Sequence, residues 1–389
     1  IGGGIDSYFG LVDDRRVDRE FLRAELGYLP PAEEWEHLLW GRGSADQLGG
    51  VVCQIMATRV LRELRELGAL RGVVVQSIAT VAEEDNDGGG PMYKMHRLID
   101  AGVEAQPDVV ILTEGTGCSE NGSLGIYRGQ RGRMQIEVEV TGKSCHGSMP
   151  WEGRNPLEYG ALILAQAADQ YRAGDGFADD AFLGAGSRTA SMATLQTPSD
   201  CAVPERFTFR LDRRLTAGED PQRALADVEQ MSSVRRAREA GLEVDVRVPV
   251  YEEPTWRGYR PGNSQIYPGW VTPEDHPAIQ EATEAYRRVV TPTIEADQSG
   301  GGLRRQPRVS RWLFSTDGVG VPVPRDSFEV SKAKRWLEEG RYHHPAMFGI
   351  GPGIEQNTHK IGECVDVRHL VPVIALLARF PSLYRNRRA

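Results

Sequence analysis

Two adjacent glutamates, Glu83 and Glu84, carry the strongest chemical signal in the chain. They follow the apolar, β-branched run 73–81, which predicts a buried strand that ends in a polar, glycine-rich loop. Neighbouring side chains on an extended segment point in opposite directions, so one carboxylate can bind a cation while the other transfers protons. The alternative is a solvated acidic loop, because runs of charge usually lie on the surface.

Three further candidate ligands occur at the ends of other predicted elements. Asp46 lies in a glycine-rich turn just before a predicted helix, Glu114 follows the apolar run 109–112, and His359 follows the glycine-rich turn 348–353. Carboxylate oxygens and an imidazole nitrogen suit Zn²⁺, Mn²⁺ or Co²⁺. The order of these motifs therefore indicates catalysis at a divalent metal. The helix after Asp46 is predicted to end at Gly68, and its apolar positions are Val52, Ile55, Met56, Val60, Leu64 and Leu67.

The elements that must position these residues fall into two groups. Continuous apolar runs such as 73–81 and 109–112 are typical of parallel strands covered by helices on both faces. Strict alternation of apolar and polar residues instead predicts half-exposed strands of an antiparallel sheet, at 134–140, 207–211 and 244–250. Helices are predicted near 155–172 and near 221–240. The predicted fold class is α/β, a mostly parallel sheet flanked by helices with a smaller inserted α+β domain.

These patterns divide the chain into three parts. We expect the metal-binding catalytic domain at 1–129 and 256–389, and the inserted dimerisation or lid domain at 130–255. The stretches 299–311 and 322–344 are expected to form long loops or an extra subdomain.

Composition limits the class of protein. The chain has 389 residues, 40% of them hydrophobic, which is enough for two domains with their own cores. The net charge of -9 argues against nucleic acid or an anionic membrane as partner, and no apolar stretch approaches the roughly 18 residues of a membrane span. Five cysteines without metal-type spacing predict reduced thiols and a cytoplasmic location. Because the chain opens at Ile1, we expect a further segment to precede it.

In this order, the motifs resemble metallopeptidase family M20, which includes glutamate carboxypeptidase, aminoacylase, acetylornithine deacetylase and succinyl-diaminopimelate desuccinylase. The similarity runs through almost the whole chain. The matching segments are 41–46, 83–84, 113–115, 142–150 with Asn155, 212–214, 315–318 and 351–353 with His359.

The resemblance implies roles for the acidic residues and His359. Asp46 looks like the carboxylate that bridges two metal positions; the alternative is an ordinary helix N-cap. Glu84 and His359 look like the other ligands of one position, and Glu114 like a ligand of the second. Glu83 looks like the general base, which takes a proton from the metal-activated water and passes it to the leaving nitrogen.

Other roles implied by the resemblance concern the substrate. His146, in the inserted domain, looks like the residue that stabilises the oxyanion, often in the partner subunit's site, which implies a homodimer through that domain. Arg214 and Asn155 resemble residues that hold a substrate carboxylate or the tetrahedral oxygen. Gly351 and Gly353 are expected to contact substrate through their backbone, because no Lys-Ser/Thr follows to make a phosphate loop.

One position departs from the family pattern. The family carries a His-x-Asp motif ahead of Asp46, and the best counterpart here is Gly4-Ile5-Asp6, with glycine in place of the histidine and Asp6 left to support the ligands. The expected cofactor is therefore one divalent transition metal per chain (Mn, Zn or Co). Two alternatives stay open: His343 or His344 substitutes, or the alignment differs near the start of the chain.

A site with one ion leaves three interpretations of function. The first is a conventional amidohydrolase or dipeptidase acting on N-acyl amino acids or similar small carboxylates. The second is hydrolytic deamination of an aromatic amine, as by the family relative 5-nitroanthranilate aminohydrolase, whose electron-poor ring would carry the developing charge. The third is a catalytically decayed binding or assembly module.

Overall fold

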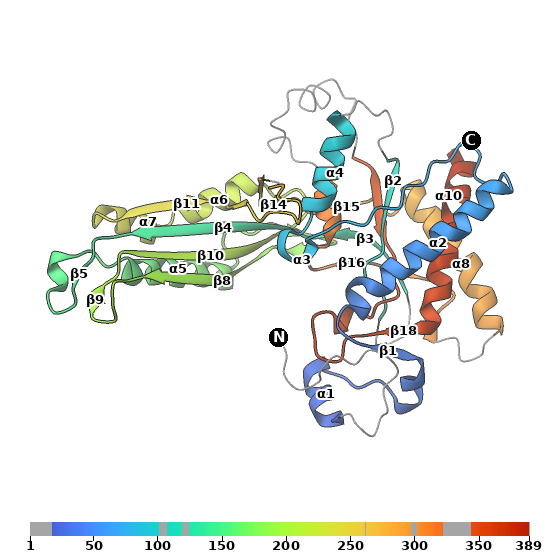
Figure 1. The fold of residues 1–389 in the computed structure, drawn as a ribbon, viewed down its shortest axis with the longest axis horizontal. Helices are drawn as coiled ribbons and strands as arrows, with labels where there is room; N and C mark the ends of the chain where they lie inside the picture. Colours follow the sequence, from blue (N-terminus) through green and yellow to red (C-terminus); the bar gives the residue numbers. More distant parts are fainter. Residues whose placement is uncertain are drawn as a thin grey trace.

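The chain builds two sheets, each with its own helices, and Figure 1 shows the second sheet extending from the first as an elongated arm. The computed structural model describes residues 18–100, 107–118, 124–260, 262–296, 302–321 and 344–388. The predicted α/β class with an inserted smaller domain is confirmed. The counterpart of the family's His-x-Asp motif, Gly4 to Asp6, lies outside the described residues, as do His343 and 322–343.

The first sheet has the strand order β15-β3-β17-β2, and β16 also pairs with β3. The pairs β17–β2 and β16–β3 are parallel, whereas β15–β3 and β17–β3 are antiparallel, so this sheet is mixed. Three helices bury one face of it in a shared core around Phe348 and Tyr286. The elements are β2 (Val109–Leu112), β3 (Gly125–Gln130), β15 (Trp270–Val271), β16 (Arg308–Trp312), β17 (Ala346–Gly349), α2 (Gly49–Glu66), α8 (Pro277–Ala296) and α10 (Leu370–Arg388).

The second sheet is antiparallel, with the order β11-β4-β10-β8 and with β14 added to β4. Its core strands bury Ile136, Val138 and Phe209 against three helices. At the far end of the arm β5 (Cys145–His146) pairs with β9 (Ala202–Val203) (Figure 1). The other elements are β4 (Gly132–Thr141), β8 (Ser187–Gln196), β10 (Arg206–Leu215), β11 (Glu243–Arg247), β14 (Ile266–Tyr267), α5 (Pro156–Ala173), α6 (Pro221–Glu229) and α7 (Ser232–Glu239).

Smaller elements connect the two sheets and frame the site. Strand β1 pairs with β18 beside α1, and the one-turn helix α3 leads into α4 where the arm begins (Figure 1). Their bounds are α1 (Arg19–Leu26), β1 (Leu38–Trp40), α3 (Glu83–Asn86), α4 (Gly89–Asp100) and β18 (Cys364–Asp366). Two further strand pairs are β6 (Asp179–Asp180) with β7 (Gly184–Ala185), and β12 (Val250–Tyr251) with β13 (Asn263–Ser264).

The predicted buried strand at 73–81 is wrong. Residues 73–82 have no regular secondary structure, and Val74 and Val81 are 82% and 70% exposed. A β-branched run forms a strand only where another strand supplies its hydrogen bonds, and no described strand pairs with this one. The helix after Asp46 forms as predicted, but its face towards the core is made of small residues such as Cys53 and Ala57, while Val52 and Ile55 are about half exposed.

Three other expectations need correction. The alternating strand β4 is not half exposed, because Arg210 and Arg247 cover and neutralise Glu137 on its polar face. The single helix expected at 221–240 is two helices, α6 and α7, since Met231 between them has an extended backbone (ψ 141°). Residues 308–311, expected in a loop, belong to strand β16, because their backbone pairs with β3.

Candidate active site

Asp46 lies where the turn after β1 meets the start of α2. Gly43 opens this turn with a left-handed backbone (φ 85°), and Asp46 follows with an extended one (φ -122°, ψ 95°). Gly50, on the first turn of α2, allows the helix to approach the end of β2, because a Cβ there would lie 1.9 Å from the Thr113 carbonyl oxygen. The absence of a side chain at Gly50 therefore brings Asp46 next to the loop that carries Glu114.

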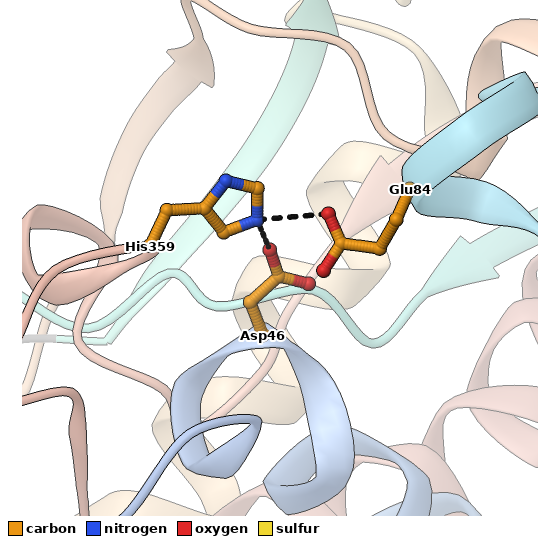
Figure 2. Close-up of side chains that lie close together, drawn as sticks. All are labelled: Asp46, Glu84 and His359. Carbon is orange, nitrogen blue, oxygen red and sulfur yellow. Dashed lines mark ion pairs between the residues drawn. The ribbon is translucent and has the colours of Figure 1, made fainter. Parts of the chain in front are cut away.

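Asp46, Glu84 and His359 converge on one point, as predicted (Figure 2). His359 Nε2 lies 2.8 Å from Asp46 Oδ2 and 3.0 Å from Glu84 Oε2. The three side chains come from the turn before α2, from α3 and from the loop after β17. The Asp46 side chain is 13% exposed, whereas those of Glu84 and His359 are about half exposed. The group is therefore anchored on one side and open to solvent on the other.

The backbone around this group is locally strained. His359 has φ 62°, and so does Ala82, which immediately precedes Glu83. Left-handed conformations are unfavourable for residues with a Cβ atom, and they tend to occur at functional sites, where surrounding contacts enforce them.

Glu83 adjoins this group with its carboxylate in an unusually acidic environment. Burial, followed by the charges of Asp87, Asp46, Asp317 and Glu84, raises the pKa of Glu83 from 4.5 to about 8. Within the described part of the chain, no hydrogen bond or ion pair occupies this carboxylate. The side chain is thus available as a proton acceptor, provided that a cation nearby offsets the negative charge.

Glu114 is buried behind the group and is not one of its three members. Its Oε2 accepts a hydrogen bond from Gln47 Nε2 at 2.8 Å, and its Oε1 accepts one from Gly115 N at 3.0 Å. Burial, and then the charge of Asp46, raises the pKa of Glu114 well above its ordinary value.

The glycine-rich turn after β17 packs against both acidic loops. A Cβ on Gly351 would lie 2.3 Å from the Thr113 carbonyl oxygen, and one on Gly353 would lie 2.4 Å from that of Ala45. Both glycines are buried. Their lack of side chains therefore allows the turn after β17 to pack closely against the loops that carry Asp46 and Glu114.

The remaining predicted residues belong to the inserted domain. His146 is exposed on β5, at the end of the arm farthest from α3 (Figure 1). Asn155 caps α5, since its side chain accepts a hydrogen bond from Leu157 N. Arg214 lies at the base of the arm, where it bonds Asp212 and, at 2.7 Å, Ser315 Oγ. Among the described residues, no hydrogen bond or ion pair joins any of these three to Asp46, Glu84 or His359.

Sequence reasoning missed two charged residues behind the group, Arg42 and Glu363. Arg42 Nη2 lies 3.1 Å from Glu84 Oε1, and Arg42 Nη1 lies 3.2 Å from Glu363 Oε2. The available signal for Glu363 was its place between Gly362 and the apolar residues Cys364 and Val365, where a charge is unexpected unless it has a buried partner.

The donor set fits a divalent transition metal. Two carboxylates and one imidazole nitrogen lie within 4.8 Å of one another. Three protein ligands with an open side are typical of catalytic rather than structural sites, since a water or substrate needs the remaining position.

Comparisons with known proteins identify relatives of the whole chain and of its inserted domain. Residues 128–240 match a family model described as a peptidase dimerisation domain. The chain is 32% identical over 349 residues to the uncharacterized protein YgeY of Escherichia coli K12, covering 90% of this chain and 73% of YgeY. It is 32% identical over 144 residues to a probable succinyl-diaminopimelate desuccinylase of Staphylococcus aureus, covering 36% of this chain and 32% of that protein.

The fold is also shared with solved structures. The M20 family metallo-carboxypeptidase Sso-CP2 of Sulfolobus solfataricus aligns with a TM-score of 0.55 and 14% identity, over 90% of this chain and 78% of that one. No helix of the described residues is long and apolar enough to cross a membrane. The matched dimerisation model overlaps the inserted domain of this fold, and the similarity to YgeY extends over most of both chains. The chain belongs to the M20 metallopeptidase family, whose members are metal-dependent hydrolases of carbon–nitrogen bonds.

Proposed function

We propose that this chain hydrolyses a carbon–nitrogen bond in a small, carboxylate-bearing molecule, with one divalent ion held by Asp46, Glu84 and His359 and with Glu83 as general base. The convergence of those three side chains beside Glu83 is the observation that carries the proposal. When bound there, a Zn²⁺, Mn²⁺ or Co²⁺ ion supplies Lewis-acid chemistry and lowers the pKa of a coordinated water.

Among the protein's own residues, Glu83 is assigned the proton transfers of the reaction. Glu83 takes a proton from the attacking water and passes it to the leaving nitrogen, so one carboxylate carries out both proton transfers. Burial and the four neighbouring acids that raise its pKa favour the protonated form of Glu83 between these two transfers. Arg214, whose guanidinium lies at the base of the arm, is the candidate for binding the substrate carboxylate.

We further infer a homodimer through the inserted domain, which we place at 130–255. The matched dimerisation model covers 128–240. Strand β8 is an edge strand exposed over residues 189–196, and an unpaired edge of this length favours pairing with a second copy. In such a dimer, His146 of one chain would approach the ligand group of its partner. Its Nδ1 accepts a hydrogen bond from Ser148 N, which leaves Nε2–H to donate to an oxyanion.

Metal-dependent turnover of a substrate panel tests the proposal. Metal-free enzyme, and enzyme reloaded with Zn²⁺, Mn²⁺ or Co²⁺, would be assayed on dipeptides, N-acyl and N-succinyl amino acids and aminobenzoates, including 5-nitroanthranilate, with products identified by mass. We expect the metal-free enzyme to be inactive, and turnover of an amide substrate to return when the metal is added back. Release of ammonia from an aminobenzoate alone would favour the aryl-amine alternative, and absence of turnover with tight metal binding would favour a non-catalytic module.

A further inference from the structure

Glu363 is a buried carboxylate directly behind the candidate metal ligands. It precedes Cys364, the first residue of β18, and its side chain is 1% exposed. Its Oε1 accepts hydrogen bonds from two consecutive backbone amides, Ala45 N at 3.0 Å and Asp46 N at 2.9 Å. The orientation of the Asp46 backbone therefore depends on a charge more than 300 positions later in the chain.

Arg42 extends this contact to a second candidate ligand. Its Nη1 lies 3.2 Å from Glu363 Oε2, and its Nη2 lies 3.1 Å from Glu84 Oε1. The other Glu84 oxygen, Oε2, faces His359 Nε2 at 3.0 Å. One guanidinium thus connects the buried carboxylate with the oxygen of Glu84 that does not point at His359.

Glu363 itself is not placed to bind an ion. Both of its oxygens are occupied, one by two amide N–H groups and the other by Arg42, and the side chain is closed to solvent. Such an arrangement compensates a buried charge and holds it in one geometry. The contacts of Glu363 therefore act on the ligands rather than on an ion.

We propose that Glu363 is a positioning residue of the metal centre, fixing Asp46 through its backbone and Glu84 through Arg42. This inference rests on the proposed function, because it assumes that Asp46, Glu84 and His359 hold a divalent ion. Groups that orient metal ligands typically contribute about tenfold to a hundredfold in metal affinity. A role confined to the stability of the turn would leave that affinity unchanged in the folded protein.

The test is Mn²⁺ affinity of the metal-free full chain, measured by the electron paramagnetic resonance signal of free Mn²⁺. Glu363→Gln keeps the size of the side chain but removes its charge and one acceptor oxygen, so either the two backbone amides or Arg42 lose their partner. We expect Mn²⁺ to bind about tenfold to a hundredfold more weakly than to wild type. Asp366→Asn is the matched control, since Asp366 is also buried, on β18, and bonds a backbone N–H and a guanidinium, both of Arg368.

The control separates stability from positioning. Both variants should lose thermal stability, but only Glu363→Gln should lose Mn²⁺ affinity. Unchanged affinity in folded Glu363→Gln, or an equal loss in Asp366→Asn, would overturn the inference. If Glu363→Gln does not fold, Arg42→Gln replaces it, because Arg42 is 51% exposed; several-fold weaker binding supports the inference and unchanged binding overturns it. Failure of the wild type to bind Mn²⁺, Zn²⁺ or Co²⁺ would instead overturn the proposed function, and the inference with it.

Discussion

Arg133, at the base of the inserted sheet, forms an ion pair with Asp87, the residue that ends the turn carrying Glu83 and Glu84. Asp87 N donates to the Glu83 carbonyl at 2.7 Å, and the Asp87 carboxylate also accepts a hydrogen bond from Ser315 Oγ at 2.6 Å. The turn with the proposed general base is thus fastened directly to the domain that carries His146.

Asp87→Asn should therefore destabilise the protein and impair turnover. The pair is nearly buried, with side chains 17% and 8% exposed, and loss of such a charged hydrogen bond costs about 2 kcal/mol. Asp245→Asn is the control, because Asp245 pairs with Arg247 at the surface (53% exposed) and should cost less than about 1 kcal/mol. Urea unfolding of both variants measures the difference. Equal costs would mean that the Arg133–Asp87 pair does not hold the turn.

The two adjacent glutamates should respond differently to the same substitution. Glu83→Gln should lower turnover by about 10² to 10⁴, the usual cost of losing a general base, while metal content stays near that of wild type. Glu84→Gln should instead lower metal content, because Glu84 is one of the three proposed ligands. Elemental analysis and steady-state rates on the same preparations decide the assignment. The reverse pattern would exchange the two roles.

The candidate metal ligands could be predicted from the sequence, whereas Glu363, which contacts the backbone behind them, could not. Asp46 and His359 each follow a recognisable turn signal, Glu84 stood out because Glu83 adjoins it, and the structure brings the three side chains together. Glu363 gave no comparable signal, because its role depends on amide groups 317 and 318 positions away. A carboxylate that accepts hydrogen bonds from distant backbone amides has no fixed sequence spacing to them, so residue type alone does not reveal its partners.

The wrong strand at 73–81 and the buried Glu137 have a related cause. The order of apolar and polar side chains predicts which face of a strand is buried if the strand pairs with a neighbour. Whether that neighbour exists, and which side chains cover each face, depends on the whole fold. No described strand pairs with 73–81, and Glu137 is buried by arginines from the neighbouring strands β10 and β11.

The number of ions can be tested at Glu114. Because Gln47 and Gly115 occupy its oxygens, Glu114→Gln should leave about one ion per chain and change the metal affinity little. Asp46→Asn should empty the site, since Asp46 is one of the three proposed ligands. Metal analysis of dialysed protein measures both. Two ions per wild-type chain, with one lost in Glu114→Gln, would establish Glu114 as a ligand and contradict the one-ion site.

Proton release should accompany metal binding. In the metal-free protein, burial and the charges of Asp87 and Asp46 raise the pKa of Glu83 to about 8, above its ordinary value of 4.5. A group whose folded pKa is raised contributes stability below pH 4.5, and that contribution is lost as the pH rises towards 8. A nearby cation reverses the effect, because it favours the carboxylate.

Metal-free wild type should therefore lose thermal stability between pH 5 and 8 more steeply than metal-free Glu83→Gln, and adding Zn²⁺ should remove most of the difference. Calorimetric titration with Zn²⁺ at pH 7, in buffers of different ionisation enthalpy, should show release of a proton by wild type that is absent from Glu83→Gln. Equal release by both proteins would mean that Glu83 is already ionised before the metal binds.

Complementation between inactive subunits tests where His146 acts. Figure 1 places β5 at the end of the arm, away from α3, so within one chain His146 and Glu83 lie at separate ends of the second sheet. If the dimer joins them across its interface, a His146→Ala chain with a Glu83→Gln chain forms one competent site per heterodimer. After complete exchange, half the dimers are mixed, so activity should return to about a quarter of wild type. Native mass spectrometry would verify the exchange. No recovery in verified heterodimers would mean that His146 does not serve the partner's site, and the homodimer would then need another role than completing the catalytic centre.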